Sequence, residues 1–284
     1  LEFFKKVGEK SVLYPEALYG MGMSYESQEK FSESLPFYEK ITNLYPDNPF
    51  ALEILERYVY LYLKAGQPDK AAAVYEDILF NKPFLKADPD AAFWLVRYRL
   101  DQGNYAGMQK ALAMLPQRLE SEAFTHPILF FLGESSMGLK QYAKAIEYYL
   151  KAIETEPQGA YAAHANLGIG IANLALKRNA EAEKYLNAAL RFDDEIKVSM
   201  RARFEIAALQ LRSARWLEAA KAFMLVAILY EDAKYTPLSL YKAGQCFAKL
   251  NRFEEADKAF LELETRYPGS FWAKRASGWR KSHV

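Results

Sequence analysis

Few side chains in this 284-residue sequence have the types and spacings that could support catalysis or metal binding. The three histidines, His126, His164 and His283, are far apart, and none belongs to an H-E-x-x-H zinc-binding pair. The chain has no G-x-S-x-G nucleophile turn and no phosphate-binding loop. The single cysteine, Cys246, excludes an intramolecular disulfide and a cysteine-based zinc site. The sequence therefore predicts a protein that is not an enzyme and needs no metal or cofactor.

Composition and charge limit the classes of partner. Hydrophobic residues make up 51% of the chain and aromatic residues 15%, which is enough to build a folded core. With 37 basic and 36 acidic residues, the net charge of +1 provides little attraction for nucleic acid. No apolar run approaches the roughly 20 residues that span a bilayer. We therefore expect a protein or peptide partner, no nucleic acid and no membrane span.

Residues 126–157 carry two segments in which apolar residues lie three and four positions apart. This spacing indicates two amphipathic helices, and the break at residues 140–141 is short enough to make them an antiparallel hairpin. Small residues occupy the positions where the two helices approach closely: Gly133 on the first, and Ala145 and Ala152 on the second.

The same pattern recurs every 37 residues. The copies begin near Pro15, Leu52, Pro89, His126, Ala163, Met200 and Pro237. In the third copy we expect Pro116 to end the second helix early, because proline breaks the hydrogen-bond ladder, and to leave residues 115–125 as an irregular linker. In the fifth copy, either Gly168 or Gly170 could be the close-packing glycine.

Leu132 and Gly133, followed by Ala145, Tyr149, Ala152 and Pro157, resemble the tetratricopeptide repeat (TPR) in residue type and spacing. The resemblance implies an all-α, right-handed superhelical solenoid of about seven helical hairpins. Residues 15–270 would hold the seven repeats. Residues 1–14 would be the second helix of a truncated repeat, so that the chain begins inside a longer array. Residues 271–284 would form a C-terminal capping helix and tail, since a terminal repeat needs its apolar face covered.

In this family the first helix of each hairpin lines the concave side of the solenoid, which is the binding groove. The resemblance places the following candidate partner-binding residues there: Glu16, Tyr19, Met23, Glu53, Glu56, Tyr60, Asp90, Phe93, Arg97, Phe130, Glu134, His164, Arg201, Phe204, Arg212, Tyr241, Gln245 and Lys249. Aromatic anchors with charged surroundings are typical of protein-binding surfaces. The alternative is that the aromatic residues pack against neighbouring repeats and the charges are simply solvated.

The charges of these groove candidates are unevenly distributed along the chain. The acidic candidates fall in the first four repeats, and Arg201, Arg212 and Lys249 fall in the last two. We therefore expect a partner segment with one basic and one acidic end, and with apolar anchors that meet Phe93, Phe130 and Phe204. The lysine, asparagine and arginine of the family's clamp for chaperone C-termini are missing from the corresponding positions, so a partner of that type is not expected.

The extended links after each repeat, such as residues 267–270 (Tyr-Pro-Gly-Ser), resemble those of bacterial envelope TPR proteins of the Tol-Pal coordinator and barrel-assembly lipoprotein type. The predicted function is a non-catalytic scaffold in a bacterial envelope or secretion complex, with a periplasmic location and a cytoplasmic one as the alternative. Two other functions fit the same sequence. The chain could be a structural protein that self-assembles through its array ends into a homo-oligomer, or the recognition domain of a larger enzyme.

Overall fold

The computed structural model describes residues 2–119, 122–192 and 194–283, and every regular element in these ranges is helical. The first six α-helices are α1 (Tyr14–Glu26), α2 (Phe31–Leu44), α3 (Pro49–Lys64), α4 (Pro68–Asn81), α5 (Pro89–Asp101) and α6 (Tyr105–Leu119). They are followed by α7 (Thr125–Gly138), α8 (Tyr142–Thr155), α9 (Ala162–Ala175), α10 (Asn179–Ala189), α11 (Ile196–Arg212), α12 (Trp216–Leu229), α13 (Tyr235–Lys249), α14 (Phe253–Arg266) and α15 (Phe271–His283). The predicted all-α fold is confirmed. Within the ranges described, no helix combines the length and apolar character needed to cross a bilayer.

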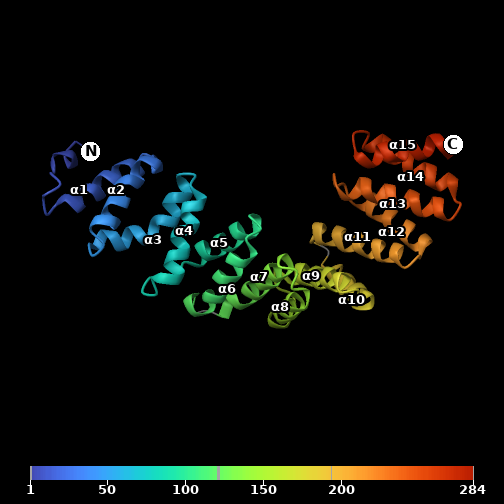
Figure 1. Cartoon of the computed structure of the whole chain (residues 1–284), viewed down its shortest axis with the longest axis horizontal. Coiled ribbons are helices and arrows are strands. Elements are labelled where there is room, and N and C mark those ends of the chain that lie inside the picture. Colours follow the sequence, from blue (N-terminus) through green and yellow to red (C-terminus); the bar gives the residue numbers. More distant parts are fainter. Residues whose placement is uncertain (1, 120–121, 193, 284) are drawn as a thin grey trace. The chain divides into compact units, whose positions relative to one another are not determined.

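The chain divides into two compact units, residues 1–124 and residues 125–284. In the first unit, α1–α6 pack as three hairpins of adjacent helices. In the second unit, α7–α14 form four hairpins, and α15 packs against α13 and α14 (Figure 1).

The turns inside the seven hairpins share one backbone conformation. Each contains a residue with positive φ, and these residues are 37 positions apart: Glu29, Gly66, Gly103, Lys140, Lys177, Ala214 and Asn251. The next residue donates its N–H to a carbonyl five positions earlier, as Gln141 does to Ser136 at 2.8 Å. This left-handed ending satisfies carbonyl groups that a helix C-terminus would otherwise leave unpaired.

In four of the hairpins, close contact between the two helices depends on one glycine of the first helix. A Cβ atom on Gly133 would overlap the ring of Tyr149, and one on Gly170 would overlap Leu186, each on the second helix of the same hairpin. Gly168, by contrast, faces Tyr149 of the preceding hairpin. The alternative left open by the sequence is thus resolved, because Gly170 is the glycine that brings α9 close to α10.

The C-terminal helix α15 covers the last hairpin, as predicted. Ala273 and Ala276 are buried in a cluster with Phe260 and Leu263 of α14. The guanidinium of Arg280 donates to Glu264 at 2.9 Å. Apolar burial and an ion pair together hold α15 against the apolar end of the array.

Two expectations about helix bounds differ from the structure. Residues 3–12 contain only the 3-10 helix η1 (Phe4–Lys6), not a full second helix. The ring of Phe4 lies against Gly20 of α1, but Gly8 disfavours helix, and so short a segment is a poor helix without a packed partner.

The other difference concerns Pro116. It lies inside the last turn of α6, which continues to Leu119, so the helix does not end early. Pro116 removes only the hydrogen bond to the carbonyl group of Leu112, and the packing of the buried Leu112 and Leu115 keeps this part of α6 helical. Of the expected linker 115–125, residues 122–124 form the 3-10 helix η2, and residues 120 and 121 lie outside the described ranges.

Candidate functional site

The side chains with the most reactive chemistry have structural roles. Cys246 is buried, and this burial raises the pKa of its thiol to about 11, which makes it a poor nucleophile. His126 is also buried. Its Nδ1 donates to the carbonyl oxygen of Ala152 at 2.9 Å, and its Nε2 accepts the N–H of Tyr161 at 3.3 Å. Both residues therefore stabilise the array.

Aromatic pairs connect successive repeats at equivalent places. We call each place a repeat joint: a residue in a first helix and the residue 31 positions later, at or just before the start of the following first helix or of α15. Five joints are aromatic: Tyr19–Phe50, Phe93–Phe124, Phe130–Tyr161, Phe204–Tyr235 and Tyr241–Trp272. In two of them the rings are stacked, with centroids 4.4 Å apart for Tyr19–Phe50 and 4.5 Å for Phe130–Tyr161.

This arrangement changes the role of several predicted groove residues. Phe130 is only 6% exposed and Tyr241 only 7%. For these two residues, packing between repeats replaces the expected contact with a partner. Tyr19, Phe93 and Phe204 are partly buried in joints of the same kind.

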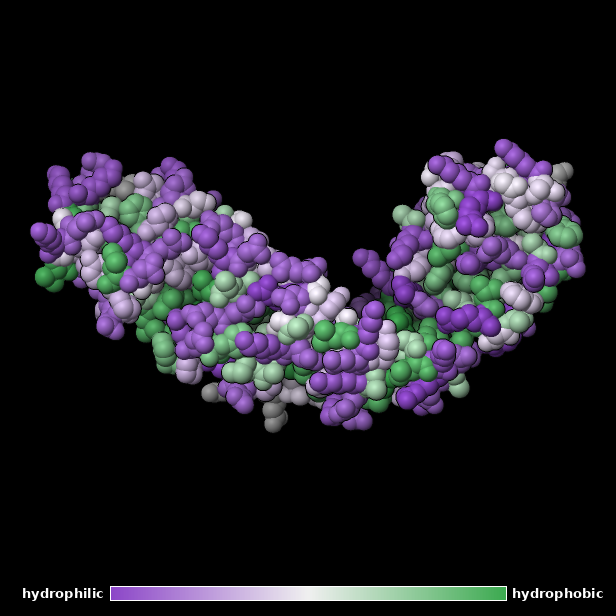
Figure 2. Space-filling view, in the orientation of Figure 1, coloured by the Kyte–Doolittle hydropathy of each residue, from purple (hydrophilic) through white to green (hydrophobic). Residues whose placement is uncertain are grey.

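The remaining candidates differ in how far they are accessible. Ten are exposed: Glu16, Met23, Glu53, Glu56, Tyr60, Asp90, Arg97, Arg212, Gln245 and Lys249. Three are partly buried: Glu134, His164 and Arg201. Hydrophilic and hydrophobic residues are interspersed over the visible face of each unit (Figure 2).

Several of the charged candidates already have partners within the chain. Glu53 accepts a hydrogen bond from Tyr19 and lies 3.6 Å from Arg57. Arg201 forms a 2.7 Å ion pair with Glu205 in α11. Because their charges are already paired within the chain, these residues are less available to attract a partner than the sequence predicts.

Glu134 is a separate case. Burial raises the pKa of its carboxyl group, although the hydrogen bond from the Tyr149 hydroxyl partly opposes this effect. His164 lies beside the same cluster, with its ring 6.1 Å from that of Phe130. Both residues thus belong to the joint region of the second unit.

Two of the seven positions do not have an aromatic pair. In the second unit, Leu167 and Val198 fill the joint with aliphatic side chains in one buried cluster. In the first unit the pair is Glu56 and Ala87, and neither side chain can fill the space that two rings occupy elsewhere.

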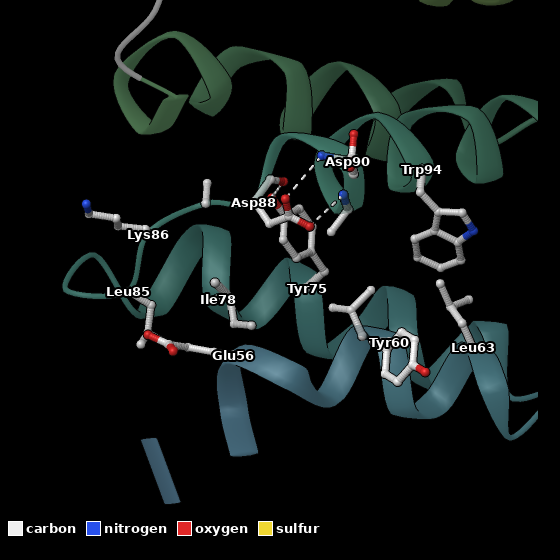
Figure 3. Close-up of a pocket in the computed structure, with 13 residues that line it drawn as sticks. Glu56, Tyr60, Leu63, Tyr75, Ile78, Leu85, Lys86, Asp88, Asp90 and Trp94 are labelled. Atoms are coloured by element: carbon white, nitrogen blue, oxygen red, sulfur yellow. Dashed lines mark hydrogen bonds between the residues drawn. The ribbon is translucent and has the colours of Figure 1, made fainter. Parts of the chain in front are cut away.

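A pocket of about 560 Å³ lies at the Glu56/Ala87 joint. Tyr60 and Leu63 of α3 and Trp94 of α5 lie together at one end, and Glu56 and Lys86 lie at the other end (Figure 3). Tyr75 and Ile78 of α4, together with Val59, Leu85, Ala87, Asp88, Asp90 and Ala91, complete the lining. Tyr60 is 50% exposed, so the apolar end is accessible to a partner.

Hydrogen bonds hold the segment between α4 and α5 that forms one wall of this pocket. The Tyr75 hydroxyl donates to the carbonyl oxygen of Asp88 at 2.6 Å. The carboxylate of Asp88 accepts the N–H groups of Asp90 and Ala91 at 3.3 and 3.2 Å and caps the start of α5 (Figure 3). These bonds stabilise the pocket in its open shape.

The same segment is also held from α6. Arg118 donates from one guanidinium nitrogen to the carbonyl oxygens of Lys82 and Leu85, at 3.1 and 2.7 Å. A cation at the C-terminal end of α4 also interacts favourably with the helix dipole. The wall is therefore fixed on both sides.

Sequence reasoning identified Glu56, Tyr60 and Asp90 but missed Leu63 and Trp94. A signal was present in the sequence, because the 31-residue series of aromatic pairs is interrupted twice, once by the aliphatic Leu167 and Val198 and once by the charged Glu56 with the small Ala87. Its meaning becomes visible only when the rings are seen in contact.

Comparison with protein-family models supports the repeat assignment. Models of the tetratricopeptide repeat match residues 16–48, 59–107, 126–158 and 238–270. Together these ranges cover just over half of the chain. The chain belongs to the tetratricopeptide repeat family. Repeats of this family are generally non-catalytic scaffolds.

Solved structures show the same fold at low sequence identity. The apo form of RapI is 14% identical, with a TM-score of 0.56 over 82% of this chain and 72% of that one. A TPR protein from Parabacteroides merdae is 16% identical, with a TM-score of 0.52 over 92% and 96% of the two chains. YrrB, described as a TPR protein with an unusual peptide-binding site, is 18% identical, with a TM-score of 0.50 over 73% and 99%. No curated protein sequence matches the chain.

Proposed function

We propose that this TPR protein is a non-catalytic scaffold that binds a segment of a partner protein on its first helices. The observation that carries the proposal is the open joint of the first unit, where an apolar pocket lies between α3 and α5 with exposed carboxylates at its edge. Exposed aromatic residues in such a setting are typical anchors for a protein partner. The peptide-binding site described for YrrB, a protein of the same fold, supports the same class of ligand.

The setting of this interaction is a finer proposal. The Tyr-Pro links, such as residues 267–270, favour a bacterial envelope or secretion complex. Fractionation of a bacterium that carries the gene would test it. We expect the full-length protein in the periplasmic or envelope fraction, and recovery in the cytoplasmic fraction alone would contradict the proposal.

Selection of phage-displayed random peptides on the purified chain tests the binding function. Enriched peptides would be synthesised, and their sites would be mapped by hydrogen exchange. We expect slower exchange in first helices such as α3 and α5, because a bound segment covers them. Failure to enrich any peptide, or protection confined to second helices such as α4 and α6, would contradict the proposal.

A further inference from the structure

We infer that the pocket at the Glu56/Ala87 joint binds one bulky apolar side chain of the partner, with a neighbouring lysine or arginine of that partner held by Glu56 and Asp90. The inference rests on the proposed function and adds the chemistry of the segment that is recognised.

The size and lining of the pocket favour a large apolar side chain. A cavity of roughly 150 Å³ is sufficient for benzene. The volume of about 560 Å³ at the joint therefore accommodates a phenylalanine, leucine or tryptophan side chain together with its adjoining backbone. Tyr60, Leu63 and Trp94 present rings and methyl groups to such a side chain, and burial of apolar surface is the main favourable term in an association of this kind.

The charge at the edge of the pocket determines which residues suit the neighbouring positions. Glu56 and Asp90 are exposed, and no cation of the described residues lies within ion-pair distance of either carboxylate. The lining also contains Lys86 and the carboxylate of Asp88, so three negative charges and one positive charge leave an excess of negative charge.

The first unit as a whole also has a net negative charge. Residues 1–124 contain 14 lysine and arginine residues and 18 aspartate and glutamate residues. A basic partner segment is therefore attracted to this unit as a whole and held by the local carboxylates, which fixes its direction more than its affinity.

Short synthetic peptides test the chemistry directly. The probes are fluorescein-labelled 11-residue peptides of serine and alanine with one central leucine, phenylalanine or tryptophan, flanked by two lysines or two glutamates, and a matched set with central alanine. By fluorescence anisotropy we expect the lysine-flanked apolar peptides to bind at least about tenfold more tightly than their alanine counterparts. The advantage of lysine over glutamate flanks should shrink as salt is raised.

Three variants localise the site. Ala87→Phe places a ring in the joint and should weaken binding by about tenfold or more, because the pocket is filled. Phe84→Ala is the matched control, since Phe84 is 70% exposed on the same segment and does not line the pocket, and it should bind like the parent chain. Glu56→Gln should reduce the preference for lysine flanks and keep the preference for a central apolar residue. Circular dichroism and thermal melting verify that each variant is folded.

Several results would overturn the inference. These are no binding of any designed peptide to the parent chain, no preference for a bulky central residue, or unchanged binding to folded Ala87→Phe. Sedimentation that shows a dimer which Ala87→Phe dissociates would make a second copy of the chain the occupant and would also overturn it. If phage-selected peptides still protect other first helices, the pocket assignment fails while the proposed function stands. If no selected peptide binds at all, the proposed function fails.

Discussion

The joints at Phe130/Tyr161 and at Glu56/Ala87 occupy the same place in two repeats, yet one is closed and the other is open. At the first, two stacked rings lie 4.5 Å apart and Phe130 is almost completely buried. At the second, a pocket of about 560 Å³ takes the place of the rings. The backbone framework is common to both, since the flanking hairpins have the same left-handed turn.

The difference between the two joints shows how a repeat array can form a surface pocket without losing its fold. Each hairpin is held internally by the packing of its two helices and by its turn, so the loss of one aromatic pair does not unfold the array. In repeat proteins stability is approximately a sum of repeat and neighbour terms, and one weaker neighbour term is tolerated. At the open joint this neighbour term is smaller, and an accessible pocket takes the place of the packed rings.

The largest expected difference between the two joints is in the free energy of unfolding. Phe130→Ala should lower it by about 3–5 kcal/mol, because a buried ring is replaced by a cavity. Glu56→Ala, at the equivalent exposed position, should change it by less than about 0.5 kcal/mol. Urea denaturation followed by circular dichroism measures both, and similar losses would refute the contrast.

A second difference concerns the helix contact beside the closed joint. Gly133 packs directly on Tyr149, whose ring is 5.9 Å from that of Phe130. Gly133→Leu should therefore cost about 1–3 kcal/mol through overpacking. A Cβ atom added at Gly278 of α15 would meet no other atom within 4 Å, so Gly278→Leu provides the control and should not lower the melting temperature. An unchanged melting temperature for Gly133→Leu would show that the register of α7 against α8 is wrong.

The turns allow a paired test of the framework that the two joints share. Gly66 has φ +69°, and Gly66→Ala should lower stability by about 1–2 kcal/mol, because a side chain is strained in the left-handed region. Ala214 has φ +55° at the equivalent position, and Ala214→Gly should raise stability. Thermal melts of the two variants should shift in opposite directions. Shifts of the same sign would contradict a common turn.

Closing the open joint sharpens the comparison further. The double variant Glu56→Tyr/Ala87→Phe restores an aromatic pair and should raise stability by about 0.5–1.5 kcal/mol beyond the sum of the two single variants. A double-mutant cycle in urea isolates this coupling. A coupling of zero would mean that the two side chains do not meet as they do at the closed joints.

The smallest expected effect is a pH dependence near the closed joint. Burial raises the pKa of Glu134 above its ordinary value of 4.5, so the unfolded state ionises first as pH rises. The contribution of Glu134 to the free energy of unfolding is therefore fully present below pH 4.5, and it is lost as pH rises through the pKa of Glu134 in the folded state. Urea denaturation at several pH values from about 4 to 8 measures this. The free energy of unfolding of Glu134→Gln should increase relative to that of the parent chain as pH rises.

Glu147 provides a control in which the expected pH dependence of stability is the opposite of that at Glu134. The hydrogen bond from Lys151, at 2.7 Å, lowers the pKa of the exposed Glu147. The free energy of unfolding of Glu147→Gln should therefore be lower than that of the parent chain above pH 4.5, and this difference should disappear as pH falls. Identical pH profiles for the Glu134 and Glu147 variants would contradict the assigned environments.

The sequence by itself determined the hairpins, their spacing and the capping helix. These follow from local rules: apolar residues three and four apart define helix faces, and a small residue such as Gly133 marks where two helices touch. The left-handed position of the turns has no consistent residue type, since it is occupied by Gly66 and Gly103 in two repeats and by Lys140 and Ala214 in two others. Local patterns suffice for these features because each hairpin is closed within about 30 residues of chain.

Only the tertiary structure decided which first-helix aromatic residues are available to a partner. Phe130 and Tyr60 are both expected on the outward face of a first helix, yet Phe130 is covered by Tyr161 and is 6% exposed. Tyr60 meets the edge of the Phe31 ring and remains 50% exposed. Exposure depends on what the following repeat places opposite a residue, and helical periodicity holds no information about that neighbour. The pocket is thus a property of two repeats in contact, and it exists because a glutamate and an alanine stand where packing elsewhere brings two rings together.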